Sequence, residues 1–203
     1  MADQSSTLFH GLDEDDALRR IVEGTASQTA ERFFLALVEN LARVLDVHGA
    51  WVTEYLEDVG RLRAFAFWLD GRCVEDYEYD IAGSPCEAVV CEARLVHIPD
   101  RVIDVYPRDP DLKKLGALSY MGAPLLDGPE RVIGHLAVLD NRPMPQEPRA
   151  EALIQIFAAR AAAELRRMRA EGELKGREEQ SRSLIEGVMD AIVLLGLYES
   201  CGQ

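Results

Sequence analysis

The residue best placed for chemistry is Cys86, near the start of a predicted helix. Ser84, Pro85 and Glu87 supply a Ser N-cap, a Pro at the first helical position and a Glu three residues after the cap. This pattern predicts a helix from Pro85 to about Ala93. The second position of such a helix lies at the positive end of the helix dipole, which favours a thiolate. Cys86 therefore fits a redox or adduct-forming sensor, and the alternative is a small residue packed against a sheet.

The other cysteines and the strand histidines form no recognisable metal site. Cys91 lies one to two turns from Cys86 in the same predicted helix, and the four cysteines show neither a CxxC pair nor zinc-like spacing. We expect free thiols in a reducing compartment. His97 and His135 each lie in an apolar strand, where an isolated histidine is usually structural, so we predict no metal or haem ligand.

The sequence carries no motif for catalysis. Ser119 has no adjacent base. Three acidic residues lie in a loop without a phosphate cradle; they are Asp100, Asp104 and Asp109. A Gly-rich nucleotide motif is also missing. We therefore predict no catalytic residue and no enzyme activity.

The pattern of apolar residues predicts an α+β fold, with helices at both ends of a mainly antiparallel sheet. A short helix is expected to follow the acidic run 13–16 and to end near Gly24, and a second helix is expected over residues 30–45. The period then changes from 3.6 to about two, which is typical of strands. The predicted strands are residues 51–56, 61–69, 73–79, 95–98, 117–126 and 131–139.

A long loop interrupts these strands at residues 100–116. It carries two prolines and is expected to contain a helical turn. Loops of this length in compact domains are often functional or act as lids. We expect this segment to cover a binding site.

The C-terminal part, residues 146–195, is almost continuously compatible with a helix. Its apolar residues step by three or four and form a seam suited to another helix; they are Ile154, Phe157, Ala161, Leu165 and Met168. The charged stretch 169–182 follows, and Leu184, Ile185, Val188 and Met189 then resume the apolar pattern. This part is predicted to be a long linker helix.

Composition excludes two classes of partner. The 203 residues carry 22 Lys and Arg against 36 Asp and Glu, a formal charge of -14, which repels nucleic acids and anionic lipid surfaces. No apolar run approaches the roughly 20 residues that span a bilayer. The polar, acidic N-terminus lacks the features of a secretory signal, so we predict a cytoplasmic protein with residues 1–12 disordered.

Two segments resemble the closing hairpin of GAF domains. Residues 119–125 read Ser-Tyr-Met-Gly-Ala-Pro-Leu, and residues 132–140 contain Gly134-His135-Leu136-Ala137-Val138, which is similar to the Gly-x-Leu-x-Val pattern of that family. Gly83-Ser84-Pro85-Cys86 and Tyr106-Pro107-Arg108-Asp109 resemble its pocket helix and lid segment. The resemblance implies a GAF-like (PAS/profilin-like) fold: a central antiparallel sheet flanked by helices, with a long C-terminal helix.

The resemblance also implies a ligand pocket between the sheet, the short inserted helix and the long loop. In this sequence the pocket would draw on aromatic residues with a few polar groups, suited to a small planar or amphipathic ligand. The candidate residues are Trp68, Tyr79, Cys86, His97, Tyr106 and Tyr120. The alternative for each is an ordinary core or rim residue.

Known GAF cofactor signatures do not match, so the cofactor stays unknown. Bilin attachment in related photoreceptors uses a Cys followed by His, whereas Glu87 follows Cys86. The Asn-Lys-Phe-Asp-Glu signature of cyclic-nucleotide GAF domains is absent. The Gly-Val-Cys-Gly and Ala-Cys-Asp contexts of free methionine sulfoxide reductase, an enzymatic member, are absent as well.

A second segment, residues 177–195, resembles the linker and opening strand of a PAS domain. The expected division is therefore a GAF-like sensory domain at 13–145, a signalling helix at 146–182 and a truncated PAS-like or other output segment at 183–203. The resemblance implies a small-molecule-sensing regulatory module, a homodimer through its terminal helices, whose kinase, cyclase or transcription output domain lies outside this chain. The alternatives are a purely structural dimerisation module and a thiol-based reductase.

Overall fold

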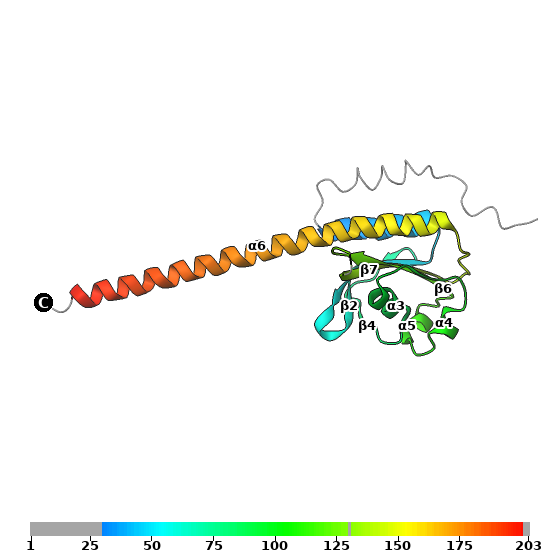
Figure 1. Cartoon of the computed structure of the whole chain (residues 1–203), viewed down its shortest axis with the longest axis horizontal. Coiled ribbons are helices and arrows are strands. Elements are labelled where there is room, and N and C mark those ends of the chain that lie inside the picture. The colour runs from blue at the N-terminus through cyan, green and yellow to red at the C-terminus, as the bar shows by residue number, and fades with distance from the viewer. Residues whose placement is uncertain (1–29, 130, 201–203) are drawn as a thin grey trace, which may run out of the picture. The chain divides into compact units, whose positions relative to one another are not determined.

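The computed structural model describes residues 30–129 and 131–200 (Figure 1). These residues belong to two units, the first extending to Glu164 and the second beginning at Leu165, and each is described by itself. The predicted disordered segment 1–12 and the predicted first helix, which ends near Gly24, lie outside the described residues.

The first unit is built on one seven-stranded antiparallel sheet with the order β3-β2-β1-β7-β6-β5, and β4 also pairs with β2. Its centre is formed by β1, β7 and β6, which are mostly buried. The strands are β1 (Gly49–Leu56), β2 (Arg61–Leu69), β3 (Arg72–Cys73), β4 (Glu78–Asp80), β5 (Val96–Ile98), β6 (Ser119–Leu126) and β7 (Val132–Asp140). The predicted α+β class and antiparallel sheet are confirmed.

One face of the sheet is covered by α2 (Ala30–Leu45) and by the first part of α6 (Pro148–Ser200) (Figure 1). The helix predicted over residues 30–45 forms as α2, and its apolar residues at three- and four-residue spacing are buried. These buried residues are Phe33, Phe34, Leu37, Val38, Leu41, Ala42 and Leu45. From α6, Ile154, Phe157 and Ala161 are buried on the same unit.

The other face carries α3 (Pro85–Glu92) and two short helices, α4 (Val102–Val105) and α5 (Pro110–Lys114). The predicted long loop therefore holds two short helices instead of one helical turn. Asp109 starts α5, since its carboxylate accepts the backbone N–H groups of Asp111 and Leu112. These helices cover the sheet face on which the candidate pocket lies.

The predicted strand at residues 73–79 is broken into β3 and β4. Asp76 lies between them with a φ of 51°, a left-handed conformation that interrupts an extended strand. The backbone N–H of Ala64 still bonds to the carbonyl of Tyr77, so this segment stays close to β2. As a result Tyr79 is carried on a separate short strand, β4, which pairs with β2.

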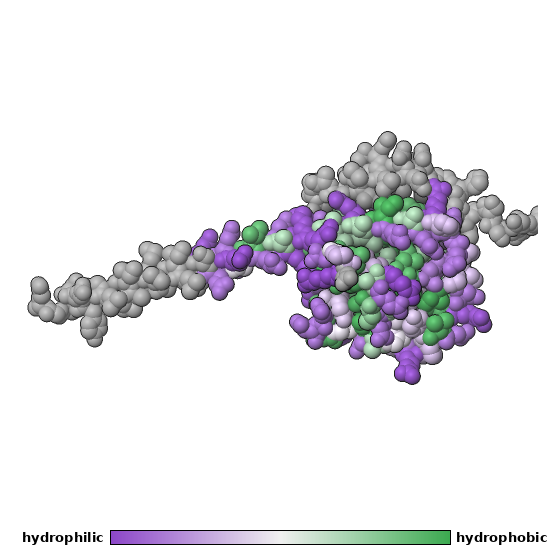
Figure 2. Space-filling model, in the orientation of Figure 1, coloured by the Kyte–Doolittle hydropathy of each residue, from purple (hydrophilic) through white to green (hydrophobic). Residues whose placement is uncertain are grey.

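The second unit consists of α6 from Leu165 onward. The strand that the PAS resemblance implied near residues 190–193 is not formed, because α6 includes these residues through Ser200. From Leu184 the apolar residues recur at a four-residue spacing, which is typical of a helix and not of a strand. Where side chains of this unit are described its surface is mainly hydrophilic, with Leu174 exposed (Figure 2). Within residues 30–129 and 131–200, no helix combines the length and apolar character that crossing a membrane requires.

Candidate functional site

Three of the six predicted ligand-binding residues meet in one place. Tyr79 of β4, Cys86 of α3 and Tyr120 of β6 lie together on the sheet face beneath α3 and α5. The hydroxyl of Tyr79 donates to Cys86 Sγ at 3.2 Å, and the hydroxyl of Tyr120 donates to the same sulfur at 3.4 Å. We call the space around them the chamber; its lining residues are Trp51, Tyr77, Tyr79, Pro85, Cys86, Asp109, Asp111, Leu112, Leu115, Tyr120 and Leu139.

A chain of hydrogen bonds runs from the sheet into the chamber. The indole N–H of Trp51 donates to the hydroxyl of Tyr79 at 3.0 Å. His135 places Nε2 at 3.4 Å from the same hydroxyl and Nδ1 at 2.6 Å from Thr53 Oγ1. One assignment satisfies every partner: Thr53 donates to Nδ1, Nε2–H donates to Tyr79, and Tyr79 donates to Cys86. His135 is fully buried, and burial lowers its pKa to about 3, so the ring is neutral as this assignment requires.

The chamber is small and carries no basic side chain. Its volume is about 20 Å³, which is room for one water molecule. Its charged residues are two carboxylates of the α5 segment, Asp109 and Asp111, and Tyr77 donates to Asp111 Oδ2 at 3.1 Å. Burial raises the pKa of Tyr77 far above its usual range, with the nearby Asp111 carboxylate as the second cause. The polar groups are therefore neutral hydroxyls, an indole, an imidazole and a thiol, closed at one side by carboxylates.

The family model for the GAF domain matches residues 29–165, which is more than half of the chain. The chain belongs to the GAF domain family. The matched range contains the whole sheet, the chamber and the first part of α6. A comparison with curated protein sequences finds no match.

Several solved structures share the fold at low sequence identity. The GAF domain of an Acinetobacter phosphoenolpyruvate-protein phosphotransferase is 18% identical with a TM-score of 0.64, covering 78% of this chain and 96% of that one. The phycocyanobilin-bound GAF domain of a cyanobacterial phytochrome is 16% identical with a TM-score of 0.62, covering 79% and 98%. A methyl-accepting chemotaxis protein fragment, residues 122 to 287, is 19% identical with a TM-score of 0.56, covering 74% and 95%. These likenesses concern the fold.

The other three predicted residues of this GAF domain lie apart from the cluster. Tyr106 is half-buried at the edge of the chamber core. Trp68 lies on the opposite sheet face, because side chains alternate along β2 and its neighbour Phe67 packs on Trp51 in the chamber core. His97 is also on the opposite face, where its ring contacts Met144 and Glu151. The structure does not bring Trp68 and His97 into the chamber.

Cys86 is in the predicted helical position, and of its two interpretations the structure favours the small residue packed against the sheet. It follows Ser84 and Pro85 at the start of α3, and it is 3% exposed. Burial raises the pKa of its thiol to about 11, and the hydrogen bonds from Tyr120 and Tyr79 lower it only in part. Desolvation therefore outweighs the helix dipole, whose stabilisation is about 0.3 to 1 kcal/mol at an exposed end. The thiol is protonated at neutral pH.

We expect Cys86 to react with iodoacetamide about 250-fold more slowly than the exposed Cys73 and Cys91 in the folded protein at pH 8. A pKa of about 11 leaves roughly one thiol in a thousand as thiolate, against about a quarter for an ordinary exposed cysteine. Peptide mapping by mass spectrometry over a time course measures each site in the wild-type protein. In 8 M urea all three should react at similar rates. Alkylation of folded Cys86 as fast as Cys91 would restore the thiolate interpretation.

Sequence reasoning missed several residues that build the site. Trp51 and Thr53 share one face of β1, and His135 is the strand partner of Thr53 on β7. The two-residue alternation of Trp51 and Thr53 indicates a strand. The sheet face on which they lie could not be predicted, because the register shifts between Val52 and Thr53. Asp109 was interpreted as a loop carboxylate and Asp111 was not considered; only the position of α5 brings both to the chamber.

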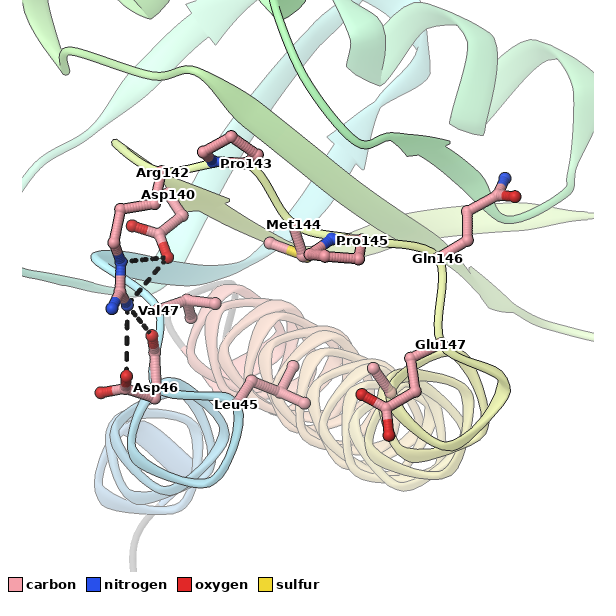
Figure 3. Close-up of a pocket in the computed structure, with 11 residues that line it drawn as sticks. Leu45, Asp46, Val47, Asp140, Arg142, Pro143, Met144, Pro145, Gln146 and Glu147 are labelled. Carbon is pink, nitrogen blue, oxygen red and sulfur yellow. Dashed lines mark hydrogen bonds and ion pairs between the residues drawn. The ribbon is translucent and has the colours of Figure 1, made fainter. Parts of the chain in front are cut away.

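A larger cavity lies elsewhere, between the end of α2 and the connection from β7 to α6 (Figure 3). Its volume is about 370 Å³, and Arg142 ties its walls together by donating to Asp140 Oδ2 at 3.1 Å and Asp46 Oδ2 at 3.2 Å. Nothing in the sequence pointed to this groove. Among the described residues, no group of three or more His, Cys, Asp or Glu side chains could hold a metal ion at either place.

Proposed function

We propose that this GAF domain is the small-molecule-sensing module of a signalling protein, and that it binds its ligand in the chamber. The observation that carries this proposal is the buried set of hydroxyl, indole, imidazole and thiol groups that β1, β4, α3, β6 and β7 bring together on one sheet face. A core that needed only to be packed would use apolar side chains, since each buried polar group must find a partner. Family membership and the printed names of the phytochrome and chemotaxis structures support the same role.

The charges around the chamber favour an uncharged or cationic ligand. No Lys or Arg lines it, two carboxylates do, and His135 is neutral. An anionic ligand would be buried without a counter-charge, which is costly. In contrast, Tyr79 and Tyr120 both donate to a thiol sulfur, which is a weak acceptor, so a ligand oxygen or ring nitrogen would be a better partner for these hydroxyls.

Ligand entry requires the α4–α5 segment to move, because a chamber of about 20 Å³ is far below the few hundred Å³ of ordinary ligand pockets. This segment joins β5 to β6 and covers the sheet face beside α3. The Tyr77–Asp111 hydrogen bond, 3.1 Å long, holds it to the segment between β3 and β4. We propose that entry of the ligand breaks this contact and selects an open state.

The output is proposed to pass through α6, which begins in the first unit and continues through the second. In the proposed cytoplasmic homodimer, paired terminal helices would transmit the change to an output domain elsewhere in the protein. The ligand must bind the two states unequally for a signal to result. The proposed role is regulatory and not enzymatic, which is supported by the protonated Cys86 thiol.

A second candidate is a structural dimerisation module that binds no ligand. The observation that favours it is the near-filled chamber, whose cluster satisfies its own hydrogen bonds. The two candidates agree on the dimer and differ in whether the chamber opens.

Native mass spectrometry of freshly purified protein is expected to show a dimer that retains a small molecule, which is released on denaturation. We expect that molecule to be uncharged or cationic at pH 7, and Tyr120→Phe should weaken its retention because one donor is lost. An absorption spectrum of the same sample reports any chromophore. A dimer without a retained molecule, unchanged after addition of a metabolite extract, would favour the structural module. A retained anion would contradict the proposed ligand chemistry.

A further inference from the structure

His97 connects the edge strand β5 to the beginning of α6. It pairs with Met121 of β6, and its side chain is 4% exposed. Its Nε2 lies 3.0 Å from the carbonyl oxygen of Met144, and its Nδ1 lies 3.4 Å from Glu151 Oε1 in the first turn of α6. The backbone N–H of Met144 also donates to the carbonyl of Pro99 at 2.8 Å. Both ring nitrogens are thus used to join segments about fifty residues apart.

The partners of the ring fix where its protons must be. A carbonyl oxygen only accepts hydrogen bonds, so the Nε2 that faces Met144 carries a hydrogen in every state. A neutral imidazole has one N–H, which leaves a lone pair on Nδ1 directed at the Glu151 carboxylate. Only the imidazolium has a second N–H, and this group donates to Glu151 in a charge-assisted hydrogen bond. The contact with Glu151 therefore exists as an attraction in one protonation state only.

We propose that His97 is a proton-dependent link between β5 and α6, closed to Glu151 when the ring is charged and reduced to the Met144 hydrogen bond when it is neutral. β5 follows α3 and precedes α4, so it directly joins two elements that cover the chamber face. The link therefore lies between the candidate ligand site and the helix proposed to carry the signal. Only this consequence for signalling rests on the proposed function; the link itself needs no ligand.

Several other charged residues lie on the segments next to this link. Met121, the neighbour on β6, is uncharged, and the connection from β7 presents the Met144 carbonyl. Glu147 and Arg149 are the remaining charged residues at the start of α6, and Asp100 and Arg101 follow β5. Glu147 provides a matched control, since its replacement removes the same charge from the same helix start.

The tautomer of His97 is the first test, and it uses the unmodified full chain. Long-range ¹H–¹⁵N NMR at high pH should show neutral His97 with its hydrogen on Nε2, and His97→Gln identifies the signals of this ring among the four histidines. A hydrogen on Nδ1 in the neutral ring would overturn the proposal, because Met144 would then lack its donor.

Hydrogen exchange of the α6 amides at residues 151–158 is the second test. Comparing each variant with wild type at the same pH cancels the intrinsic pH dependence of exchange. Glu151→Gln should speed exchange about two- to fivefold at pH 5.5, the range expected for a partly exposed ion pair, and the excess should vanish at pH 8. His97→Gln keeps a donor for Met144 and should show the same pattern.

Glu147→Gln should give the same exchange ratio at both pH values, because it removes charge without removing the proton-dependent contact. A ratio for Glu151→Gln that is equal at pH 5.5 and pH 8 would overturn the link. Failure of the chamber to bind any molecule would leave these ratios unchanged, so the two proposals fail separately.

Discussion

Replacing Gly134 with alanine is expected to lower the free energy of unfolding by about 3 kcal/mol or more. A Cβ at this position would lie 2.0 Å from the carbonyl oxygen of Thr53 and 3.1 Å from Glu54 Cα. These are backbone atoms of the neighbouring strand β1, which pairs with β7 at this point and cannot move aside without losing ladder hydrogen bonds. Urea denaturation followed by circular dichroism measures the change.

Gly49→Ala is the matched control, since Gly49 lies in the same sheet at the start of β1. Its Cβ would meet the side-chain ends of Leu69 and Leu139 at 3.0 Å and 3.4 Å. Such side chains can shift, so a loss of about 1 kcal/mol is expected. Equal losses in Gly49→Ala and Gly134→Ala would show that the close backbone approach is not what requires glycine.

Gly134 also explains how the resemblance in the sequence relates to the structure. The Gly-x-Leu-x-Val pattern of residues 134–138 identified the hairpin, and the structure gives a physical reason for its first residue: β1 and β7 approach too closely for a side chain there. The next residue, His135, is thereby held opposite Thr53. The motif was readable from the sequence, but its cause is a contact with a strand about eighty residues away.

Most elements of the fold could be predicted because their residues determine them locally. The apolar stripe of α2 and the Ser-Pro start of α3 needed no tertiary information, and both elements formed at the predicted places. The break between β3 and β4 was not predictable, since an Asp in a left-handed conformation at residue 76 leaves no clear mark in the pattern. The continuation of α6 through Ser200 was hidden by a resemblance that implied a strand.

The site was less predictable, because it depends on strand face and burial. An aromatic residue in a strand can lie on either face of the sheet, and a difference of one position decides which. Trp68 lies on the face opposite the chamber, whereas Trp51 lines the chamber. Local position also left two interpretations open for Cys86, and burial favours the packed residue, since the helix dipole is weaker than the cost of removing a thiolate from water. Both outcomes depend on long-range packing that local sequence does not encode.

The wild-type protein is expected to lose about 2 kcal/mol of unfolding free energy through His135 alone when the pH falls from 7.5 to 5.0. Burial lowers the pKa of this fully buried histidine to about 3, whereas a histidine in an unfolded chain titrates near 6.5. Between these values the unfolded chain binds a proton that the folded chain does not, so stability is complete above about pH 6.5 and falls as the pH approaches 3. Urea unfolding at the two pH values measures the loss.

Comparison with His135→Gln isolates this contribution from the other titrating groups. That variant should lose about 2 kcal/mol less than wild type over the same interval, although it starts less stable because the bond to Thr53 Oγ1 at 2.6 Å is altered. His48→Gln removes a histidine outside the chamber and controls for the effect of a His→Gln substitution as such. If His135→Gln loses as much stability as wild type, the pKa of His135 is not lowered in the fold, and the folded protein takes up a proton on this ring as the pH falls to 5.0. That result would contradict the buried neutral imidazole on which the hydrogen-bond assignment depends.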